Sequence, residues 1–338
     1  MVDQVVRWLG IFTNPVGGQR PRQRSPSRML GTSLTFLLGH TLAATTVGVC
    51  DRRQGWLFNT HQMKLYKTKQ GVVVENEKGF YSLKNEDWDT FVNDENLHKK
   101  ISQKIKDILP SKNNLIENLF APVGSKQELW ACGVTYLRSK IGRQEESKDA
   151  GGGDFYARVY EAERPEVFFK ANPHRIVGPN DKVRIRKDST WDVPEPELTL
   201  VVSSTGKIIG YTIGNDMSSR SIEGENPLYL PQAKTYDACA AIGPCIYVGD
   251  SPLDKNGMIR LEISRTNKVV FDGSVSLTQM KRTPEELVSF VFRECSFPHG
   301  CLIMTGTGIV PEHDFTLKSG DEIRISIDGI GTLVNEVL

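Results

Sequence analysis

The chain has 338 residues, enough to bury a full core in one large domain with a smaller domain beside it. Its 42 lysines and arginines nearly balance its 41 aspartates and glutamates, so its charge gives no electrostatic reason to expect a nucleic acid or a membrane as partner. Apolar residues make up 38% and charged residues 25% of the chain, which is the composition of a soluble globular protein.

The first 62 residues differ from the rest in composition. Acidic residues are nearly absent, because no aspartate or glutamate occurs between Asp3 and Asp51. Four arginines cluster between residues 20 and 28. A basic stretch before an apolar one leaves a targeting signal open, although the run is too weakly apolar to predict a membrane helix. We favour a disordered or untranslated extension, because Met63 opens a segment that reads like a natural domain start.

Residues 63–124 have the pattern of a small N-terminal α+β domain. Alternating runs separated by glycine turns predict three short strands, at 64–66, 72–75 and 80–83. Apolar residues at helical spacing predict helix within 85–109, where Asn85 could cap the first turn. Nothing in this segment suggests chemistry of its own.

The remaining residues, 125–338, are expected to form the catalytic domain. Its first apolar run, 129–136, predicts a strand that leads into a polar junction. There Arg138 and Ser139 could hold a carboxylate or hydroxyl of a substrate, and a plain strand-to-helix junction is the alternative. A second strand is predicted at 167–169, and we expect Lys170, at its end, to face the site and bind the substrate.

The chemistry is expected around Glu195 and Glu197. Pro194 and Pro196 forbid a helix and hold this pair extended, so both glutamates point to the same face of a strand. The alternative is that these two glutamates, together with Asp216, are three solvated acids on an edge strand.

A hairpin is predicted to bring Asp216 back to the two glutamates. The runs 198–202 and 208–213 are apolar and are joined by the turn Ser-Ser-Thr-Gly. Three converging carboxylates without a nearby histidine or cysteine suit a hard divalent cation, Mg2+ or Mn2+. Lys234, further along the chain, could move protons beside such a metal, although most lysines are ordinary surface residues.

The C-terminal part continues with strands and one helix. A hairpin is predicted over 259–272, and an amphipathic helix over 283–295 in which Thr283 and Glu286 form a capping box. A strand at 302–304 runs into Thr305, Gly306 and Thr307, whose hydroxyl and N–H groups could grip a carboxylate. No Gly-x-Gly-x-x-Gly unit supports a nucleotide cofactor. The six cysteines are scattered without a Cys-x-x-Cys pair, which favours reduced thiols in a cytoplasmic enzyme.

Taken in order, these pieces resemble the fumarylacetoacetate hydrolase family over about residues 120–338. The resemblance implies a mixed β-roll of mainly antiparallel strands with a small N-terminal α+β domain, a Mg2+ ion on Glu195, Glu197 and Asp216, and a homo-oligomer. The motifs that carry the resemblance are Phe168–Lys170, Pro194–Glu197, Gly210–Asp216, Lys234 with Asp237, Gly243-Pro244 and Thr305–Thr307.

One departure from the family pattern bears on the reaction. Family hydrolases that cut carbon–carbon bonds usually carry Asn-Tyr-x-x-His-x-x-Glu, whose histidine and glutamate activate water. Here Ser139 stands at the histidine position and Gly142 at the glutamate position. The missing base puts hydrolysis in doubt.

Other stretches resemble the family members that dehydrate 2-keto-3-deoxy sugar acids, namely 133–136, 164–170 and 225–232. This resemblance implies a metal-dependent lyase that converts such an acid, most simply 2-keto-3-deoxy-D-arabinonate, to a ketoacid semialdehyde. It also implies a catalytic carboxylate at Glu166, with Glu163 as the close competitor, and proton transfer by Lys234 together with that carboxylate.

Two other functions stay open. A hydrolase, decarboxylase or isomerase acting on an acylpyruvate or related 2-keto acid could use the same metal site, with Glu166 acting through a water. A metal-binding protein without activity is the third interpretation, and the intact set of three carboxylates with Lys234 argues against it. In the enzyme interpretations the partner is a small 2-keto acid, with no role for a nucleic acid or, for the catalytic domain, a membrane.

Overall fold

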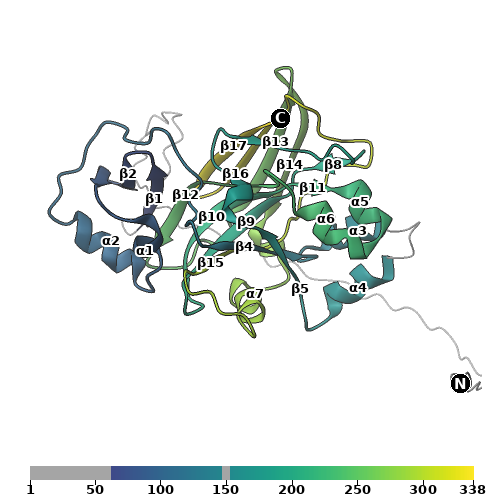
Figure 1. The fold of residues 1–338 in the computed structure, drawn as a ribbon, viewed down its shortest axis with the longest axis horizontal. Helices are drawn as coiled ribbons and strands as arrows, with labels where there is room; N and C mark the ends of the chain where they lie inside the picture. Colours follow the sequence, from purple (N-terminus) through teal and green to yellow (C-terminus); the bar gives the residue numbers. More distant parts are fainter. Residues whose placement is uncertain (1–61, 147–152) are drawn as a thin grey trace, which may run out of the picture. The chain divides into compact units, whose positions relative to one another are not determined.

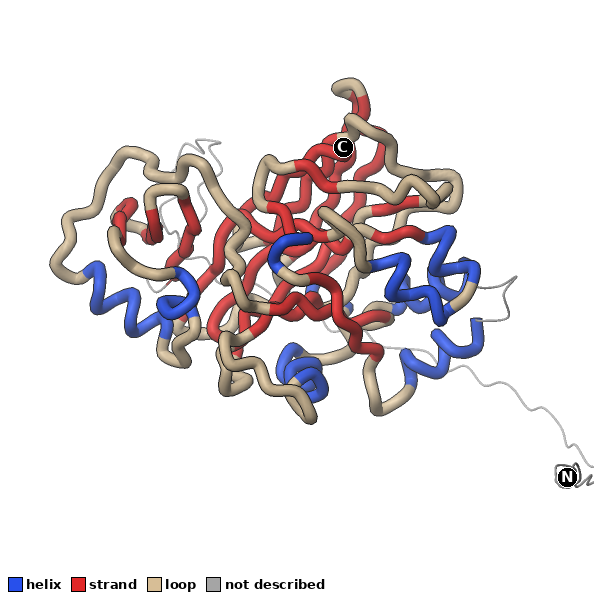
Figure 2. The backbone as a smooth tube through the Cα atoms, viewed as in Figure 1, coloured by secondary structure: helices blue, strands red, loops and turns tan. Residues whose placement is uncertain are grey.

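The computed structural model describes residues 62–146 and 153–338, so the interpretations of residues 1–61 lie outside the described part. Two β-sheets form its centre, and short helices lie at their ends and edges (Figures 1 and 2). The α+β class and the mixed, mainly antiparallel β-roll that the sequence predicts are confirmed. No helix of the described residues is long and apolar enough to cross a membrane.

The larger sheet has ten strands. They are β1 (Gln62–Thr68), β2 (Gly71–Asn76), β3 (Gly79–Leu83), β4 (Glu128–Gly133), β5 (Glu166–Ala171), β6 (Ile176–Val177), β9 (Pro196–Val202), β10 (Ile208–Asp216), β12 (Ala240–Gly249) and β15 (Cys301–Met304). Their order is β3-β2-β1-β12-β10-β9-β15-β4-β5, with β6 paired to β12. The centre of this sheet, β10 and β9, is therefore also the stretch in which the sequence places the metal ligands.

The smaller sheet has five strands, and two short strands pair separately. The five are β7 (Lys182–Val183), β13 (Met258–Arg265), β14 (Lys268–Ser276), β16 (Glu322–Ile327) and β17 (Gly331–Val337), in the order β14-β13-β16-β17-β7. The short pair is β8 (Asp192–Val193) with β11 (Ser218–Ser219). The hairpin predicted over 259–272 is confirmed as β13 and β14.

The N-terminal segment joins the larger sheet directly. Strand β1 pairs antiparallel with β12, and the side chains of α1 (Trp88–Val92) and α2 (Leu97–Ile105) pack in one cluster with residues of β9, β10 and β12. The boundary at residue 124 stays a prediction, and strand pairing crosses it. The expected cap at Asn85 is wrong: Asp87 caps α1, accepting from Thr90 N–H at 3.0 Å, while Asn85 has a φ of 70°.

The helices near the site are short. They are α3 (Leu137–Glu146), α4 (Gly153–Glu161), α5 (Arg220–Glu225) and α6 (Leu230–Lys234), and α7 (Pro284–Val291) lies further along the chain. Thr283 caps α7 as predicted, since its hydroxyl oxygen accepts from Glu286 N–H at 3.2 Å. The Glu286 carboxylate instead contacts Arg282 Nη1 at 2.5 Å, and α7 ends at Val291 rather than at residue 295.

Candidate metal centre and active site

Glu195, Glu197 and Asp216 converge as the sequence predicts. The β9–β10 hairpin pairs Glu197 with Gly214 in antiparallel register, and Glu195 exchanges backbone hydrogen bonds with Asp216. Cross-strand partners share a face, so one oxygen of each carboxylate lies within 4.8 Å of the others. All three side chains are buried, which excludes the alternative of three solvated surface acids.

The donor set fits a hard divalent cation. It consists of carboxylate oxygens alone, the ligands that Mg2+ and Mn2+ prefer, without the thiolate or imidazole of a typical zinc site. These strands are central in the sheet, which holds the ligands on rigid backbone. Glu195, Glu197 and Asp216 are therefore the residues that would hold the metal.

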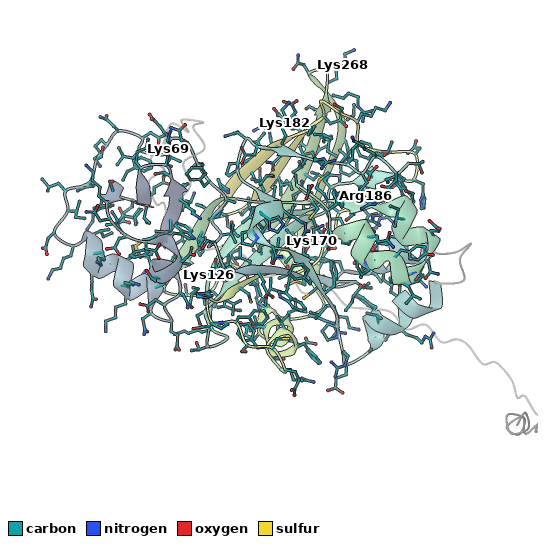
Figure 3. All side chains as sticks on the ribbon, viewed as in Figure 1. Lys69, Lys126, Lys170, Lys182, Arg186 and Lys268 are labelled. Carbon is teal, nitrogen blue, oxygen red and sulfur yellow. The ribbon has the colours of Figure 1, made fainter. Side chains whose placement is uncertain are left out.

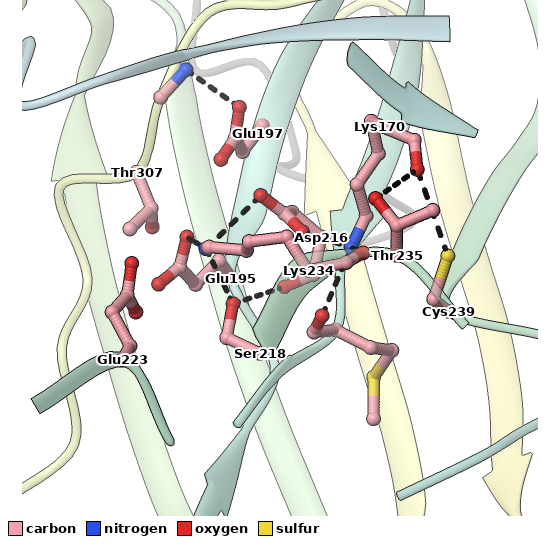
Figure 4. A network of polar contacts seen from close by, with 12 residues as sticks. Lys170, Glu195, Glu197, Asp216, Ser218, Glu223, Lys234, Thr235, Cys239 and Thr307 are labelled. Atoms are coloured by element: carbon pink, nitrogen blue, oxygen red, sulfur yellow. Dashed lines mark hydrogen bonds and ion pairs between the residues drawn. The ribbon is translucent and has the colours of Figure 1, made fainter. Parts of the chain in front are cut away.

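Lys234 lies inside the acidic cluster. It ends α6 and is fully buried, and its ammonium contacts Glu195 Oε2 at 2.8 Å, Asp216 Oδ2 at 3.1 Å and Ser218 Oγ at 2.5 Å (Figure 4). Lysines are almost never fully buried unless paired, so the surface-lysine alternative is excluded. A buried ammonium thus lies directly against two of the candidate metal ligands.

Lys170 is a second buried lysine in the site. Most labelled lysines in Figure 3 reach outward, whereas Lys170 lies among the strands and is fully buried. Its ammonium contacts Asp216 Oδ1 at 2.5 Å, Met217 O at 3.0 Å and the backbone oxygen of Lys234. An ammonium has three donors, so these contacts occupy Lys170 in holding Asp216 rather than in the substrate contact expected from the sequence.

Arg220 completes the charges around the cluster, and the sequence analysis missed it. It is buried at the start of α5, and its Nη2 lies 2.6 Å from Glu195 Oε1. Three buried cations, Lys170, Lys234 and Arg220, therefore contact two of the three carboxylates, Glu195 and Asp216. The available signal was an arginine four residues after Asp216, which alone is too common to single out.

The carboxylates of the cluster differ in proton affinity. Burial, reinforced by the charges of Asp216 and Glu195, holds the pKa of Glu197 well above its usual range. Burial acts in the same direction on Asp216, but the ammonium groups of Lys170 and Lys234 together outweigh it and lower the Asp216 pKa. The cluster therefore keeps one firmly ionised carboxylate beside one that binds a proton readily.

Glu166 and not Glu163 lies at the site. Glu166 starts β5, and its Oε2 is buried without a hydrogen-bond donor among the described residues. The charges of Lys234, Glu195 and Asp216 act on it. Glu163 is exposed. Burial raises the pKa of Glu166, against the opposing charges of Arg143 and Lys234. A carboxyl with a raised pKa in a site is suited to proton transfer.

The loop Thr305–Thr307 holds a metal ligand. Gly306 N–H donates to Glu197 Oε2 at 2.5 Å, and the hydroxyl groups of Thr305 and Thr307 donate to the backbone oxygens of Leu198 and Ile309. Gly306 has a φ of 91°, and a Cβ there would overlap Thr135 Oγ1. Gly306 thus holds a carboxylate of the protein itself, that of Glu197, and substrate binding by Thr305, Gly306 and Thr307 stays a prediction.

The polar junction at Arg138 and Ser139 points elsewhere than expected. Arg138 Nη2 lies 3.7 Å from the exposed Glu312, and Ser139 Oγ donates to Tyr136 O and accepts from Tyr136 N–H at the start of α3. The α3 arginine that reaches inside is Arg143, which forms a buried ion pair with Glu223 of α5. These partners are 80 positions apart, so no local pattern could have revealed them.

Comparison with known proteins decides the family. Residues 143–338 match the family described as Fumarylacetoacetate (FAA) hydrolase C-terminal. The chain belongs to the fumarylacetoacetate hydrolase family. The resemblance read from the motifs is confirmed, and the acidic cluster and Lys234 of this family member lie on the strands and helix that those motifs occupy.

Two sequence relatives and one solved structure are similar over much of the chain. A probable 2-keto-3-deoxyxylonate dehydratase of Haloferax volcanii is 50% identical over 212 residues, 62% of this chain and 72% of the relative. The 2-dehydro-3-deoxy-D-arabinonate dehydratase of Saccharolobus solfataricus is 44% identical over 62% of this chain and 71% of the relative. A structure of 2-keto-3-deoxy-D-arabinonate dehydratase with magnesium and 2,5-dioxopentanoate has a TM-score of 0.67 at 34% identity, covering 82% of this chain and 98% of the other.

Proposed function

We propose that the protein is a Mg2+-dependent hydro-lyase that removes water from a 2-keto-3-deoxy sugar acid and yields a ketoacid semialdehyde. The observation that carries the proposal is the contact of the buried Lys234 ammonium with both Glu195 and Asp216. It places a proton carrier against a cluster of hard oxygen ligands. The two dehydratase relatives, at 50% and 44% identity, support the same reaction class.

The substrate we expect is a 2-keto-3-deoxypentonate. The keto-deoxy acids of D-arabinonate and D-xylonate are one compound, because the reaction that forms them removes the stereocentres at C2 and C3 and leaves only C4. The relatives' different names thus point to the same substrate class. Loss of one water from this acid gives the formula of 2,5-dioxopentanoate, the ligand of the similar solved structure.

The residues would divide the proton transfers between them. Mg2+ on the three carboxylates would supply Lewis-acid polarisation of the 2-keto group, which acidifies the C3 hydrogens. Lys234, as the neutral amine after its ammonium has given up a proton, is the base that takes a C3 proton, since its nitrogen lies against two of the ligands. Glu166, whose pKa is raised by burial, is the acid that protonates the departing C4 hydroxyl. The C3=C4 double bond formed in this step then moves to C4=C5, as one proton leaves C5 and another returns to C3. Protonation of the resulting enol at C4, with loss of its O–H proton, gives the C5 aldehyde.

The residues at the positions of the hydrolytic histidine and glutamate also agree with dehydration. Hydrolysis of a carbon–carbon bond needs a base that activates water, and Ser139 occupies the family's histidine position with its hydroxyl engaged by the Tyr136 backbone. Gly142 has no side chain to offer in place of the glutamate. Elimination of water requires proton carriers but no attacking water, so it can proceed without this pair.

The test offers metal-stripped full-length protein either a 2-keto-3-deoxypentonate or an acylpyruvate, with and without added Mg2+, and follows products by NMR. We expect Mg2+-dependent loss of water from the sugar acid, abolished by Glu197→Gln and by Lys234→Ala. Cleavage of the acylpyruvate without turnover of the sugar acid would replace the proposal with a hydrolase. No turnover of any 2-keto acid with Mg2+ bound would indicate a binding protein.

Assembly and compartment are part of the same proposal. We expect a homo-oligomer, as is usual in this family, and a molar mass from light scattering at a multiple of 37.8 kDa would support it. We expect residence in the cytoplasm, because the described cysteines 132, 239, 245, 295 and 301 are free thiols, the state that a reducing compartment maintains.

A further inference from the structure

Arg143 and Glu223 form an ion pair that the proposed reaction has not yet used. The pair joins α3 to α5, and the two side chains are only 5% and 1% exposed. Removing two charges from water is costly, and a buried ion pair is weak evidence for a purely stabilising role. A pair of this kind near a catalytic cluster therefore calls for a functional explanation.

Helix α5 fixes the pair beside the acidic cluster. Arg220 and Glu223 are three positions apart and lie on the same side of the helix, and Arg220 holds Glu195 at 2.6 Å. In Figure 4 the Glu223 carboxylate points toward Glu195 and Thr307. The Arg143 guanidinium bound to it is thus held next to the site rather than at the periphery.

The pair lies at the end of the site away from Lys170. Glu166 and Lys170 lie four residues apart near the two ends of β5, a separation of about 13 Å along a strand. Lys170 contacts Asp216, whereas the charge of Arg143 acts on Glu166 and its guanidinium carbon lies 5.6 Å from the Tyr156 ring. The site therefore has a metal end and an arginine end.

These two ends match the two ends of the expected substrate. A 2-keto acid that chelates a metal through its carboxylate and keto oxygens directs its hydroxyl-bearing carbons away from the ligands. A guanidinium offers up to five donors in a fixed fork, and a carboxylate accepts from hydroxyl groups. At the arginine end, the guanidinium can donate a hydrogen bond to a terminal hydroxyl group, and a carboxylate can accept one from it.

We propose that Arg143, held in place by Glu223, is a specificity residue that donates a hydrogen bond to the C5 hydroxyl of the substrate. The proposal rests on the proposed function and adds the selection between sugar acids and simpler 4-hydroxy-2-keto acids. A site built to hydrogen-bond a hydroxyl rejects the analogue that lacks it, because its buried polar groups are then left unpaired.

The experiment compares two substrates on three proteins. One substrate is the 2-keto-3-deoxypentonate and the other is 4-hydroxy-2-oxopentanoate of the same C4 configuration, which keeps the chelating end and the leaving hydroxyl but has a methyl group at C5. The proteins are the unaltered chain, Arg143→Met and Arg260→Met. Arg260 is a matched control, because it forms an exposed pair with Asp328 on the smaller sheet.

We expect the unaltered protein to prefer the hydroxylated substrate by about 100-fold or more in kcat/KM. Arg143→Met should bring this ratio toward one by raising KM and lowering kcat for the hydroxylated substrate alone, while Arg260→Met keeps the ratio. Arg143→Lys should restore part of the preference. Glu223→Gln, which is isosteric, should lose part of it and serves if Arg143→Met does not fold.

The outcomes separate this proposal from the proposed function. Equal losses on both substrates in Arg143→Met would show a purely structural clamp and overturn the specificity role. An unaltered protein that turns over both substrates equally would overturn it as well. An unaltered protein that dehydrates neither substrate while binding Mg2+ in calorimetry would contradict the proposed function instead.

Discussion

Glu195 and Asp216 exchange two backbone hydrogen bonds, at 2.9 and 3.2 Å, where β9 and β10 come together. This pairing fixes both side chains on one face, two positions from the Glu197–Gly214 pair. The ligand geometry is therefore set by the register of a central hairpin. A one-residue slip in that register would send one side of the cluster to the opposite face.

Glu197→Gln should weaken metal binding without unfolding the protein. Glu197 is buried and has the Gly306 N–H as a donor, so a glutamine of the same shape fits but contributes no charge to the metal. We expect the Mg2+ affinity from calorimetry to fall on the order of 100-fold. Glu322→Gln, an exposed glutamate on β16, is the control; an equal fall in both variants would contradict the assignment of Glu197.

Lys234→Ala should stop the chemistry and spare the metal. Without the side-chain amine of Lys234, the C3 proton has no nearby base, and we expect kcat to fall by about 100- to 10,000-fold. Exchange of the C3 hydrogens with deuterated solvent, followed by NMR, should be lost to the same extent. If exchange at C3 continues unchanged while Mg2+ still binds, another group is the base.

Gly306→Ala should lower the free energy of unfolding by more than backbone strain alone explains. Gly306 and Gly320 have φ values of 91° and 83°, but a Cβ at Gly306 would meet Thr135 Oγ1 and Cys132 O, whereas nothing lies within 4 Å at Gly320. We expect Gly320→Ala to cost roughly 1 kcal/mol in the free energy of unfolding from backbone strain. Gly306→Ala should cost at least twice as much in urea titrations and weaken Mg2+ binding, because its N–H holds Glu197. Equal costs would show that the overlap is relieved.

Asp192→Asn should change how stability depends on pH. Burial raises the Asp192 pKa from 3.8 to about 6, against a hydrogen bond from Ser189 and the charge of Arg186, and its Oδ1 finds no hydrogen-bond partner among the described residues. Because the folded state binds this proton more tightly than the unfolded state, Asp192 lowers the free energy of unfolding as pH rises from about 4 to 6.

The asparagine variant lacks this titration. We expect it to be more stable than the unaltered protein above pH 6, by up to about 3 kcal/mol, with the difference vanishing near pH 4. Urea unfolding at pH 4 and at pH 7.5 measures both values. A difference of the same size at the two pH values would show that Asp192 is ionised throughout.

Removal of metal should leave the protein folded. Glu195 and Asp216 already contact Lys170, Lys234 and Arg220, and Glu197 accepts from the Gly306 N–H. Stripping the metal therefore does not leave the carboxylates facing only one another. We expect the circular dichroism spectrum to stay unchanged in EDTA, unlike that of small domains whose folding depends on zinc. Loss of sheet signal on chelation would mean that the cations do not hold the cluster together.

The parts of the site that depend on short stretches of sequence were predictable. The prolines around Glu195 and the short turn before β10 specify the hairpin, and the hairpin specifies where Asp216 lies. The role of Gly306 was partly visible, because a glycine-rich loop after a strand suggests exposed N–H groups. That these groups hold Glu197 rather than a substrate depends on the β15–β9 pairing, which no short motif encodes.

The rest depended on contacts between distant parts of the chain. Arg138 was chosen from the sequence because it directly precedes Ser139, and Arg143 was not considered although it directly follows Gly142. The turn of α3 directs Arg138 toward Glu312. Choosing correctly required knowing that α5 lies against α3. Lys170 was expected to face the site and does, but its donors are taken by Met217 and the chain around Lys234, which only the folded backbone reveals.

The pairing of β1 with β12 has a practical consequence for anyone who shortens this protein. The segment that matches the family begins at residue 143, yet a chain cut there would lose β1 to β4 and bare one edge of β12. It would also uncover Val201, Ile246 and Val248, which pack against the N-terminal helices. Unpaired strand edges and exposed apolar faces promote aggregation, so truncation from the front should yield insoluble material before it yields a smaller enzyme.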